Sequence, residues 1–207
     1  MIRKSRLSLL VPSLVLFLIP AVARSSEQTS GLVLGGALNA PLRIEVFSDF
    51  ECPGCRLFYR ELIRPVLQDY ASKDKVCVIY HEFPMKYHKY AQKAARYCEA
   101  AYKIGREKAL LVINALFAEQ DKWTQDGNVE RVVATVLSPS DSSKLKVILK
   151  DPSIDRSIAE GIKLGTQRDV HGTPTMFVYY LGKHQKVESP HQMSYLTLKQ
   201  FIDQVVK

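Results

Sequence analysis

Near the start of the chain, the pattern of hydrophobic and polar positions predicts a strand, a helix and a second strand. Residues 42–50, L-R-I-E-V-F-S-D-F, begin with alternating apolar and polar side chains, which is typical of a strand. Residues 56–70 place apolar side chains at helical spacing, and Pro65 is a point where this helix could kink. Residues 76–83, V-C-V-I-Y-H-E-F, are β-branched and aromatic, which favours another strand. This order predicts a βαβ unit with a parallel pair of strands.

The following part of the chain has only helical patterns. Residues 88–104 carry alanines, Cys98 and Tyr102 on one face, which predicts an amphipathic helix. Four more helical patterns follow without a strand pattern between them, at about residues 107–119, 128–137, 142–149 and 154–169. Helix starts are expected at Asp126 or Gly127, Ser140 or Asp141, and Ser153.

Strand patterns return near the end of the chain. Residues 175–180, T-M-F-V-Y-Y, predict a strand that turns at 181–183 and pairs with residues 185–188 as a hairpin. Residues 194–206 predict a closing helix. The chain is therefore expected to be of the α/β class, with βαβ and ββα halves separated by an all-helical insertion. The expected boundaries are 41–87 for the first half, 88–169 for the insertion and 170–207 for the second half.

The first residues of the chain have the three parts of a secretory signal peptide. The basic start M-I-R-K-S-R precedes an apolar run at residues 7–19, which is shorter than the ~20 residues that span a bilayer as a helix. Pro20 and the small-residue pattern A-V-A follow, so we expect cleavage after Ala23, with an uncleaved anchor as the alternative. Residues 24–40 are expected to form a mobile leader.

Composition and charge agree with an exported, soluble domain. The 207 residues are 46% hydrophobic, enough for one sizeable core. The formal net charge of +8 becomes +5 without residues 1–23, which contain three basic residues and no acid. The other charges are dispersed, which favours a basic soluble surface over a nucleic-acid partner. The organisation of the chain indicates a bacterial periplasmic or secreted protein, in a compartment where disulfides persist.

Cys52 and Cys55, in S-D-F-E-C-P-G-C, stand where the first helix is predicted to begin. At a helix N-terminus, unpaired N–H groups and the helix dipole stabilise a thiolate, so Cys52 is the expected nucleophile. Cys55 lies one turn further on and could resolve a mixed disulfide. Pro53 suits a first helical turn, and Gly54 adds backbone freedom. Two alternatives stay open: a structural disulfide, whose short loop would constrain little, and a copper site completed by a remote histidine.

Residues 170–175, V-H-G-T-P-T, form a second motif directly before a predicted strand. Pro174 donates no hydrogen bond to a sheet, which is reasonable if the Thr173–Pro174 bond is cis in a tight turn. The Thr173 backbone could then pair with an extended substrate beside Cys52. An ordinary loop proline is the alternative, and the residues alone do not decide between the two.

With both motifs in this order, residues 35–207 resemble the DsbA-like thiol–disulfide oxidoreductases of the thioredoxin fold. The resemblance rests on G-G-A-L-N-A-P-L-R-I-E-V-F-S-D-F-E-C-P-G-C, E-F-P-M-K-Y-H-K-Y-A-Q-K-A-A-R and V-H-G-T-P-T-M-F-V, and on the place of the helical insertion. It implies that Cys52 is the nucleophile, Cys55 the resolving cysteine, and Thr173-Pro174 the cis-proline loop facing them. The implied reaction donates the Cys52–Cys55 disulfide to exported, folding proteins. A membrane protein of the DsbB or vitamin K epoxide reductase type would then reoxidise the pair.

The chain departs from this family's pattern between the two cysteines. Strong oxidants of the family commonly carry a histidine there, which helps to stabilise the thiolate, whereas this chain has the dipeptide Pro53-Gly54. His171, beside the proline loop, is a hypothetical replacement. The simpler alternative is that His171 is a partly exposed loop residue.

A second departure concerns a buried acid. Thioredoxin and several relatives have one six residues before the nucleophile, where it assists proton transfer at the resolving thiol. This chain has Val46 there, and the nearby Glu45, Asp49 and Glu51 are candidates to replace the acid.

The remaining candidate residues lie elsewhere in the chain. Cys77, on a predicted strand, and Cys98, on the next helix, could form a second disulfide, or both could be buried free thiols. His88 is expected to cap or pack at a helix start, and Trp123 to lie in the core or to line a groove.

The sequence thus predicts a monomeric, exported oxidoreductase of the thioredoxin fold that acts as an oxidase, without a cofactor or a metal. A reductase or isomerase with the same cysteines is the nearest alternative, although the chain has no dimerisation domain like that of the isomerases. A non-catalytic copper-binding protein of the same fold is the alternative from another class.

Overall fold

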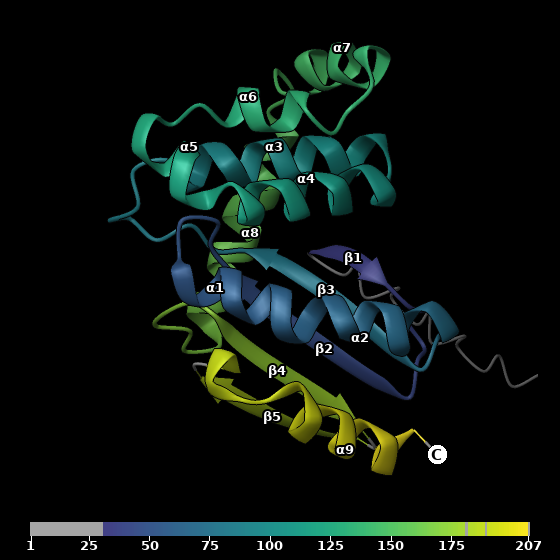
Figure 1. The fold of residues 1–207 in the computed structure, drawn as a ribbon. Coiled ribbons are helices and arrows are strands. Elements are labelled where there is room, and N and C mark those ends of the chain that lie inside the picture. The colour runs from purple at the N-terminus through teal and green to yellow at the C-terminus, as the bar shows by residue number, and fades with distance from the viewer. Residues whose placement is uncertain (1–30, 181, 189, 207) are drawn as a thin grey trace, which may run out of the picture.

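A mixed five-stranded sheet with strand order β1-β3-β2-β4-β5 lies at the centre of the fold (Figure 1). The structure is a computed structural model that describes residues 31–180, 182–188 and 190–206, so the expected signal peptide lies outside the described residues. The strands are β1 (Leu32–Gly35), β2 (Leu42–Ser48), β3 (Val76–Glu82), β4 (Thr175–Tyr180) and β5 (Lys183–Glu188). The expected βαβ unit and the closing hairpin are both present.

The pairing of the strands sets which side chains share a face. β2 and β3 are parallel, with Leu42 opposite Val76 and Ser48 opposite Glu82. β4 lies antiparallel to β2 on its other side, and β5 is antiparallel to β4. Because side chains alternate along a strand, the even-numbered residues of β2 and β3 face one layer of helices and the odd-numbered residues face the other.

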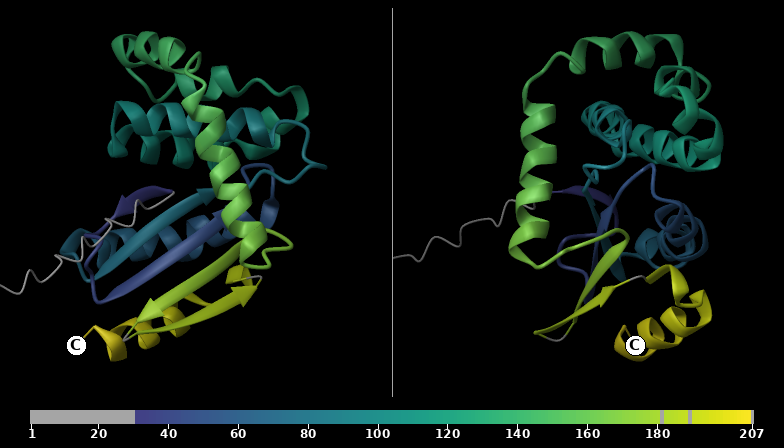
Figure 2. Two further views of the ribbon diagram at one scale, coloured as in Figure 1. Left: turned by 180° about the vertical axis from the view of Figure 1, so that it is seen from behind. Right: turned by 90° about the vertical axis from the view of Figure 1, so that its left-hand side faces the viewer.

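Helices cover both faces of this sheet. One face carries the helical segment after β2 and the C-terminal helix, whereas α8 crosses the opposite face (Figure 2). The remaining insertion helices form a separate layer beside the sheet, next to the start of α1 (Figure 1). The helices are α1 (Pro53–Phe58), α2 (Arg64–Asp69), α3 (Ala91–Ile104), α4 (Arg106–Ala118), α5 (Gln120–Asp126), α6 (Val129–Ala134), α7 (Pro139–Ile148), α8 (Ser153–Gln167) and α9 (Tyr195–Val205). In the described ranges, no helix combines the length and apolarity needed to cross a bilayer.

A π-helical turn, η1 (Tyr59–Ile63), separates α1 from α2. It directly precedes Arg64 and Pro65, which open α2. A proline inside an α-helix lacks an N–H and crowds the preceding turn, and a widened turn relieves that crowding. The kink expected at Pro65 therefore takes the form of this π turn.

Several local expectations need correction. Residues 32–35 of the expected leader form β1, because Leu32 and Leu34 are buried against β3 while their neighbours are less buried. The segment before residue 128 forms a short helix, α5, that no apolar pattern indicated. The side chains of Asn128 and Ser138 cap α6 and α7, in place of the residues expected from the sequence.

The core is divided by the sheet. The larger cluster joins the even-numbered face of β2 and β3 to the active-site helix and the insertion, and includes the fully buried Trp123. A small aromatic cluster around Phe47 and Phe177 lies on the other face, under α8. On that face Glu45 forms an ion pair with Arg43 at 3.0 Å and a second ion pair with Arg168.

Candidate active site

Cys52 occupies the N-cap position of α1, as the sequence predicts. Its backbone is extended, with φ −74° and ψ 118°, and Pro53 follows at the first helical position. The Cys55 N–H donates to the Cys52 sulfur across 3.4 Å, which uses one of the helix's otherwise unpaired donors. The Cys52 side chain is half-buried, whereas Cys55 is fully buried. The pair therefore has one accessible sulfur and one sheltered sulfur.

Both thiols are free in the structure, and their surroundings separate their acidities. A hydrogen bond from Cys55 and the Cys55 backbone N–H lower the pKa of Cys52 to about 6, against opposing effects of burial and of the Asp49 charge. Burial, together with the neighbouring Cys52, raises the pKa of Cys55 well above its usual value. The Asp49 N–H also donates to the Cys55 sulfur across 3.4 Å. At neutral pH the arrangement holds a thiolate at Cys52 and a neutral thiol at Cys55.

The loop before β4 closes over the Cys52 sulfur. The peptide bond between Thr173 and Pro174 is cis. The Thr173 carbonyl oxygen lies 3.2 Å from the Cys52 sulfur, and the Thr175 hydroxyl donates to the Gly172 carbonyl across 2.8 Å. A hollow of about 200 Å³ adjoins this loop. An extended chain attached to Cys52 would lie along these backbone groups.

A histidine does stand beside the dipeptide, but it is His191 rather than His171. A Cβ placed on Gly54 would lie 3.4 Å from the His191 ring and 3.3 Å from the Pro174 ring, so the imidazole lies over the space that a longer side chain would use. His171 is exposed, and neither His171 nor His191 is among the groups that shift the pKa of Cys52. His191 comes from a short 3-10 turn, Pro190–Gln192, that packs on α1. Nothing in the local sequence indicates that this turn returns to the cysteines.

The three acids expected near the cysteines have different surroundings. Glu45 faces the opposite side of the sheet and is bound to Arg168, so it cannot serve Cys55. Glu51 accepts the Tyr90 N–H. Asp49 is buried, and its carboxylate accepts hydrogen bonds from the Met85 N–H at 2.7 Å and from His88 at 2.8 Å. Asp49 is therefore the acid of the three that borders the cysteine pair.

Sequence reasoning did not identify Glu82, which lies on β3 directly opposite Ser48. It is 2% exposed, and neither carboxylate oxygen has a hydrogen-bond partner among the described residues. Burial raises its pKa well above the usual value, so the group is held neutral. The Ser48 side chain lies beside Cys55 and acts to lower the pKa of that thiol. A buried acid is thus present near Cys55, on the strand next to the one that holds Val46.

The insertion supports the site through Gln120, the first residue of α5. Its side-chain amide donates to the Phe50 carbonyl at 2.7 Å and to the Cys52 carbonyl at 3.1 Å. Trp123, one turn later, donates its indole N–H to the Leu116 carbonyl and fixes α5 against α4. Since α5 shows no apolar pattern, the sequence gives no signal for Gln120.

Cys77 and Cys98 do not form the second disulfide that the sequence left open. Both are fully buried free thiols. Cys98 lies beside Glu82 on the even-numbered face of β3, whereas Cys77 points to the odd-numbered face, next to Arg43 and Glu45. The sheet stands between the two sulfurs, which excludes a bridge without rearrangement of the backbone.

In the described residues, no three His, Cys, Asp or Glu side chains are grouped so that they could hold a metal ion. The copper alternative requires a histidine that joins Cys52 and Cys55 as a ligand. His191 is the histidine nearest to the dipeptide, and it does not complete such a group.

Comparisons with known proteins agree with this architecture. A family model described as thioredoxin matches residues 28–204. A probable disulfide bond formation protein D of Bacillus cereus is 23% identical over 147 residues, which cover 69% of this chain and 68% of the relative. Wolbachia pipientis alpha-DsbA1 has a similar structure, with a TM-score of 0.66 and 20% identity over 83% of this chain and 88% of that one. Oxidised BdbD of Bacillus subtilis gives a TM-score of 0.67, with 18% identity over 84% and 92% of the two chains.

Proposed function

This chain belongs to the thioredoxin family, as a DsbA-like protein disulfide oxidoreductase, and on that premise we propose that it is an oxidase. Its substrates would be exported proteins that are still folding. The proposal rests chiefly on one observation: the pKa of Cys52 is lowered to about 6, while burial raises that of Cys55. A stabilised Cys52 thiolate favours the reduced form, and a dithiol that prefers to be reduced gives its disulfide away readily.

Each step of the exchange makes use of this asymmetry. A substrate thiolate attacks the Cys52 sulfur, because the sulfur of Cys55 is buried. The Cys52–Cys55 bond breaks, and the Asp49 N–H stabilises the departing Cys55 sulfur until it takes up a proton. A second substrate thiolate then attacks the substrate sulfur, forms the new disulfide and expels the Cys52 thiolate. Cys52 is a good leaving group because its pKa is low.

The proline loop would hold the substrate during this exchange. The Thr173 carbonyl lies beside the Cys52 sulfur and is available to a backbone N–H of an extended chain. Such pairing reads the backbone and not the side chains, which suits an enzyme that acts on many unfolded sequences. Pro174 offers no N–H, so the substrate would pair with the residue before it.

The proposal includes export by the N-terminal segment, action as a monomer, and reoxidation by a membrane protein. The segment that would direct export lies at residues 1–23, outside the described residues. Reoxidation requires an electron acceptor that takes two electrons from the Cys52–Cys55 dithiol, and a quinone-linked protein of the DsbB or vitamin K epoxide reductase type would supply it.

Equilibration with glutathione, followed by mass spectrometry of the trapped thiols, tests the direction of exchange. Nucleophilic cysteines with a pKa of about 7 in thioredoxin and about 3.5 in DsbA accompany reduction potentials of about −270 mV and about −120 mV, and we expect an intermediate potential here. In the same buffer, the oxidised protein should accelerate disulfide formation in a reduced, unfolded ribonuclease more than the reduced protein accelerates cleavage of insulin. A potential at or below about −270 mV, with faster insulin reduction, would identify a reductase instead.

A further inference from the structure

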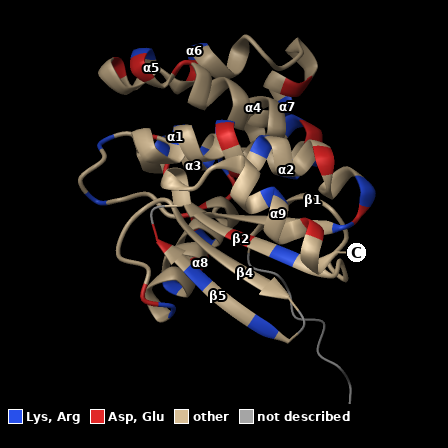
Figure 3. Cartoon of the chain, turned by 60° about the horizontal axis from the view of Figure 1, so that its bottom comes forward, with Lys and Arg blue, Asp and Glu red and all other residues tan. Residues whose placement is uncertain are grey.

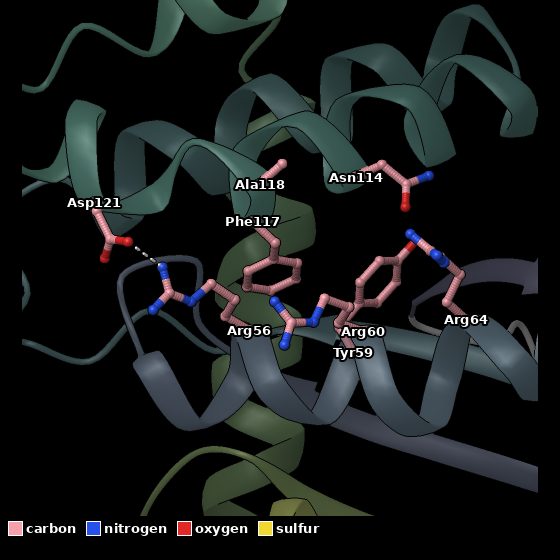
Figure 4. A pocket seen from close by; sticks show the side chains of 8 residues that line it. All are labelled: Arg56, Tyr59, Arg60, Arg64, Asn114, Phe117, Ala118 and Asp121. Carbon is pink, nitrogen blue, oxygen red and sulfur yellow. Dashed lines mark hydrogen bonds and ion pairs between the residues drawn. The ribbon is translucent and has the colours of Figure 1, made fainter. Parts of the chain in front are cut away.

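A cavity of about 280 Å³ lies between the active-site helix and the insertion, and Arg56 is one of its lining residues (Figure 4). One wall is the segment from α1 through the π turn to the start of α2. The other wall is α4 and the first turn of α5, which contribute Asn114, Phe117 and Asp121. No step of the disulfide exchange described above uses this cavity.

Three arginines line one wall of the cavity. Arg56, Arg60 and Arg64 recur every fourth residue and extend their guanidinium groups toward the cavity (Figure 4). Like charges at this spacing repel one another. Arg56 is paired with Asp121 at 2.7 Å and Arg60 with its neighbour Glu61 at 2.7 Å, whereas Arg64 has no carboxylate partner among the described residues. Elsewhere, Lys and Arg are spread over many elements with Asp and Glu among them (Figure 3).

A buried hydroxyl group at the same cavity is also without a partner. Tyr59 is 3% exposed, and its hydroxyl makes no hydrogen bond among the described residues. In Figure 4 the ring of Tyr59 lies between the arginines, with its hydroxyl near the Arg64 guanidinium. Buried hydroxyls are nearly always hydrogen-bonded, so this unpaired hydroxyl beside a cavity is a place where a bound molecule can supply an acceptor. The amide nitrogen of Asn114 is already used by the Leu110 carbonyl.

We propose that this cavity binds a compact small molecule carrying two or more phosphate or carboxylate groups. A guanidinium group can bind two oxygens of a phosphate or of a carboxylate at once, and the Tyr59 hydroxyl adds one more donor. The volume lies just under the ~300–1,000 Å³ of typical drug-sized sites, which favours a small anion over a protein segment. Such a ligand neutralises the three arginines and competes with Asp121 for Arg56. The proposal does not depend on the redox function.

Titration calorimetry with pyrophosphate and with citrate, each at constant ionic strength in sodium chloride, tests the site directly. We expect saturable binding of one anion per protein. Arg60→Gln/Arg64→Gln should weaken this binding by at least about tenfold, because two charge-assisted contacts are lost. The control Lys146→Gln/Lys150→Gln removes the same charge from exposed positions at the same spacing on and just after α7, and should bind as the unchanged protein does.

Two further variants locate the ligand inside the cavity. Tyr59→Phe removes only the unpaired hydroxyl and should weaken binding about fivefold. Asp121→Asn removes the competing carboxylate and should tighten binding about threefold or more, a gain that damage to the fold cannot produce. Tighter binding of pyrophosphate identifies a phosphate-bearing ligand, and tighter binding of citrate identifies a polycarboxylate.

Three results would overturn the proposal. The first is that the Arg60→Gln/Arg64→Gln protein binds both anions as tightly as the unchanged protein does. The second is an equal loss in the control variant, which would reveal a general effect of net charge. The third is a Tyr59→Phe protein that binds both anions as tightly as the unchanged protein, which would place the anion on the outer surface of the helix.

Discussion

Cys52 and Cys98 both stand on helices, but only Cys52 stands at a helix start. Cys52 receives the Cys55 N–H and faces the proline loop, and its pKa is lowered. Cys98 lies within α3 and is fully buried, and its burial and the neighbouring Glu82 raise its pKa. Cys77, on β3, is likewise buried, with a raised pKa. A cysteine thiol is thus reactive or inert according to the backbone N–H donors around it and its access to solvent. The spacing of the cysteines in the sequence did not reveal this for Cys77 and Cys98.

The largest expected difference between the two pairs is in catalysis. Cys52→Ser removes the attacked sulfur and should lower the rate of oxidation of a reduced, unfolded ribonuclease by at least about a thousandfold. Cys77→Ala leaves the site untouched and should retain the rate within about twofold. Each variant is added to reduced ribonuclease in a buffer without glutathione, and the recovery of ribonuclease activity is measured. Comparable losses in the two variants would contradict the separate roles given to the pairs.

The next difference is in reactivity toward iodoacetamide. In the reduced, folded protein we expect only Cys52 to be alkylated at pH 7, at least about a hundredfold faster than the buried thiols. Its rate should rise about tenfold per pH unit at low pH and level off above about pH 6, where the thiolate fraction becomes complete. Mass spectrometry of peptides identifies the modified residue, and guanidinium chloride should make all four cysteines react. A midpoint near pH 9 would show that the Cys52 thiolate is not stabilised.

The same lowered pKa makes the stability of the reduced protein depend on pH. Between about pH 6 and pH 9 the unfolded chain binds a proton at Cys52 that the folded chain does not, so stability should rise with pH across this window. The contribution is complete above the unfolded pKa and is lost as the pH falls through about 6. Oxidised protein, which has no Cys52 proton to lose, serves as the control in urea unfolding at several pH values.

The buried acid beside Cys98 should act in the opposite direction. The raised pKa of Glu82 means that the folded chain keeps a proton which the unfolded chain loses above about pH 4.5, so Glu82 reduces stability as the pH rises. Glu82→Gln should therefore stabilise the protein more at pH 8 than at pH 5, because the amide carries no proton that the unfolded chain loses. Urea unfolding measures both. Glu107→Gln, at an exposed position on α4, should show no such pH-dependent gain.

The sequence predicted the parts of the molecule that depend on local chemistry. The strand patterns around residues 42–50 and 175–180, and the cysteines at a helix start, follow from periodicity and from capping. The resemblance named the correct fold. Local patterns missed α5, because Trp123 is its one buried apolar side chain and a single position makes no apolar stripe.

The parts that could not be predicted depend on contacts between distant segments. Gln120 reaches the active-site loop over a sequence separation of 68 residues, and His191 approaches Gly54 from the far end of the chain. The placement of Cys77 and Cys98 on opposite faces follows from which residues of β3 face the insertion. Every position of β3 is buried, so apolar and polar residues do not alternate along it as they do on a strand with one exposed face. The sequence therefore does not show which of its side chains face the insertion.

The smallest expected effect concerns His191, which lies beside the Cys52–Cys55 pair and has no counterpart at Cys77 and Cys98. His191→Ala removes the imidazole that lies over Gly54 and should raise the rate of Cys52 alkylation at pH 7 about two- to threefold, because the reagent then reaches the sulfur more easily. The midpoint of the pH profile should stay near 6, because His191 is not among the groups that shift the pKa of Cys52. His171→Ala should leave both the rate and the profile unchanged, because His171 is exposed and is not among the groups that shift the pKa of Cys52. A change in the His171 variant and none in the His191 variant would reverse the assignment.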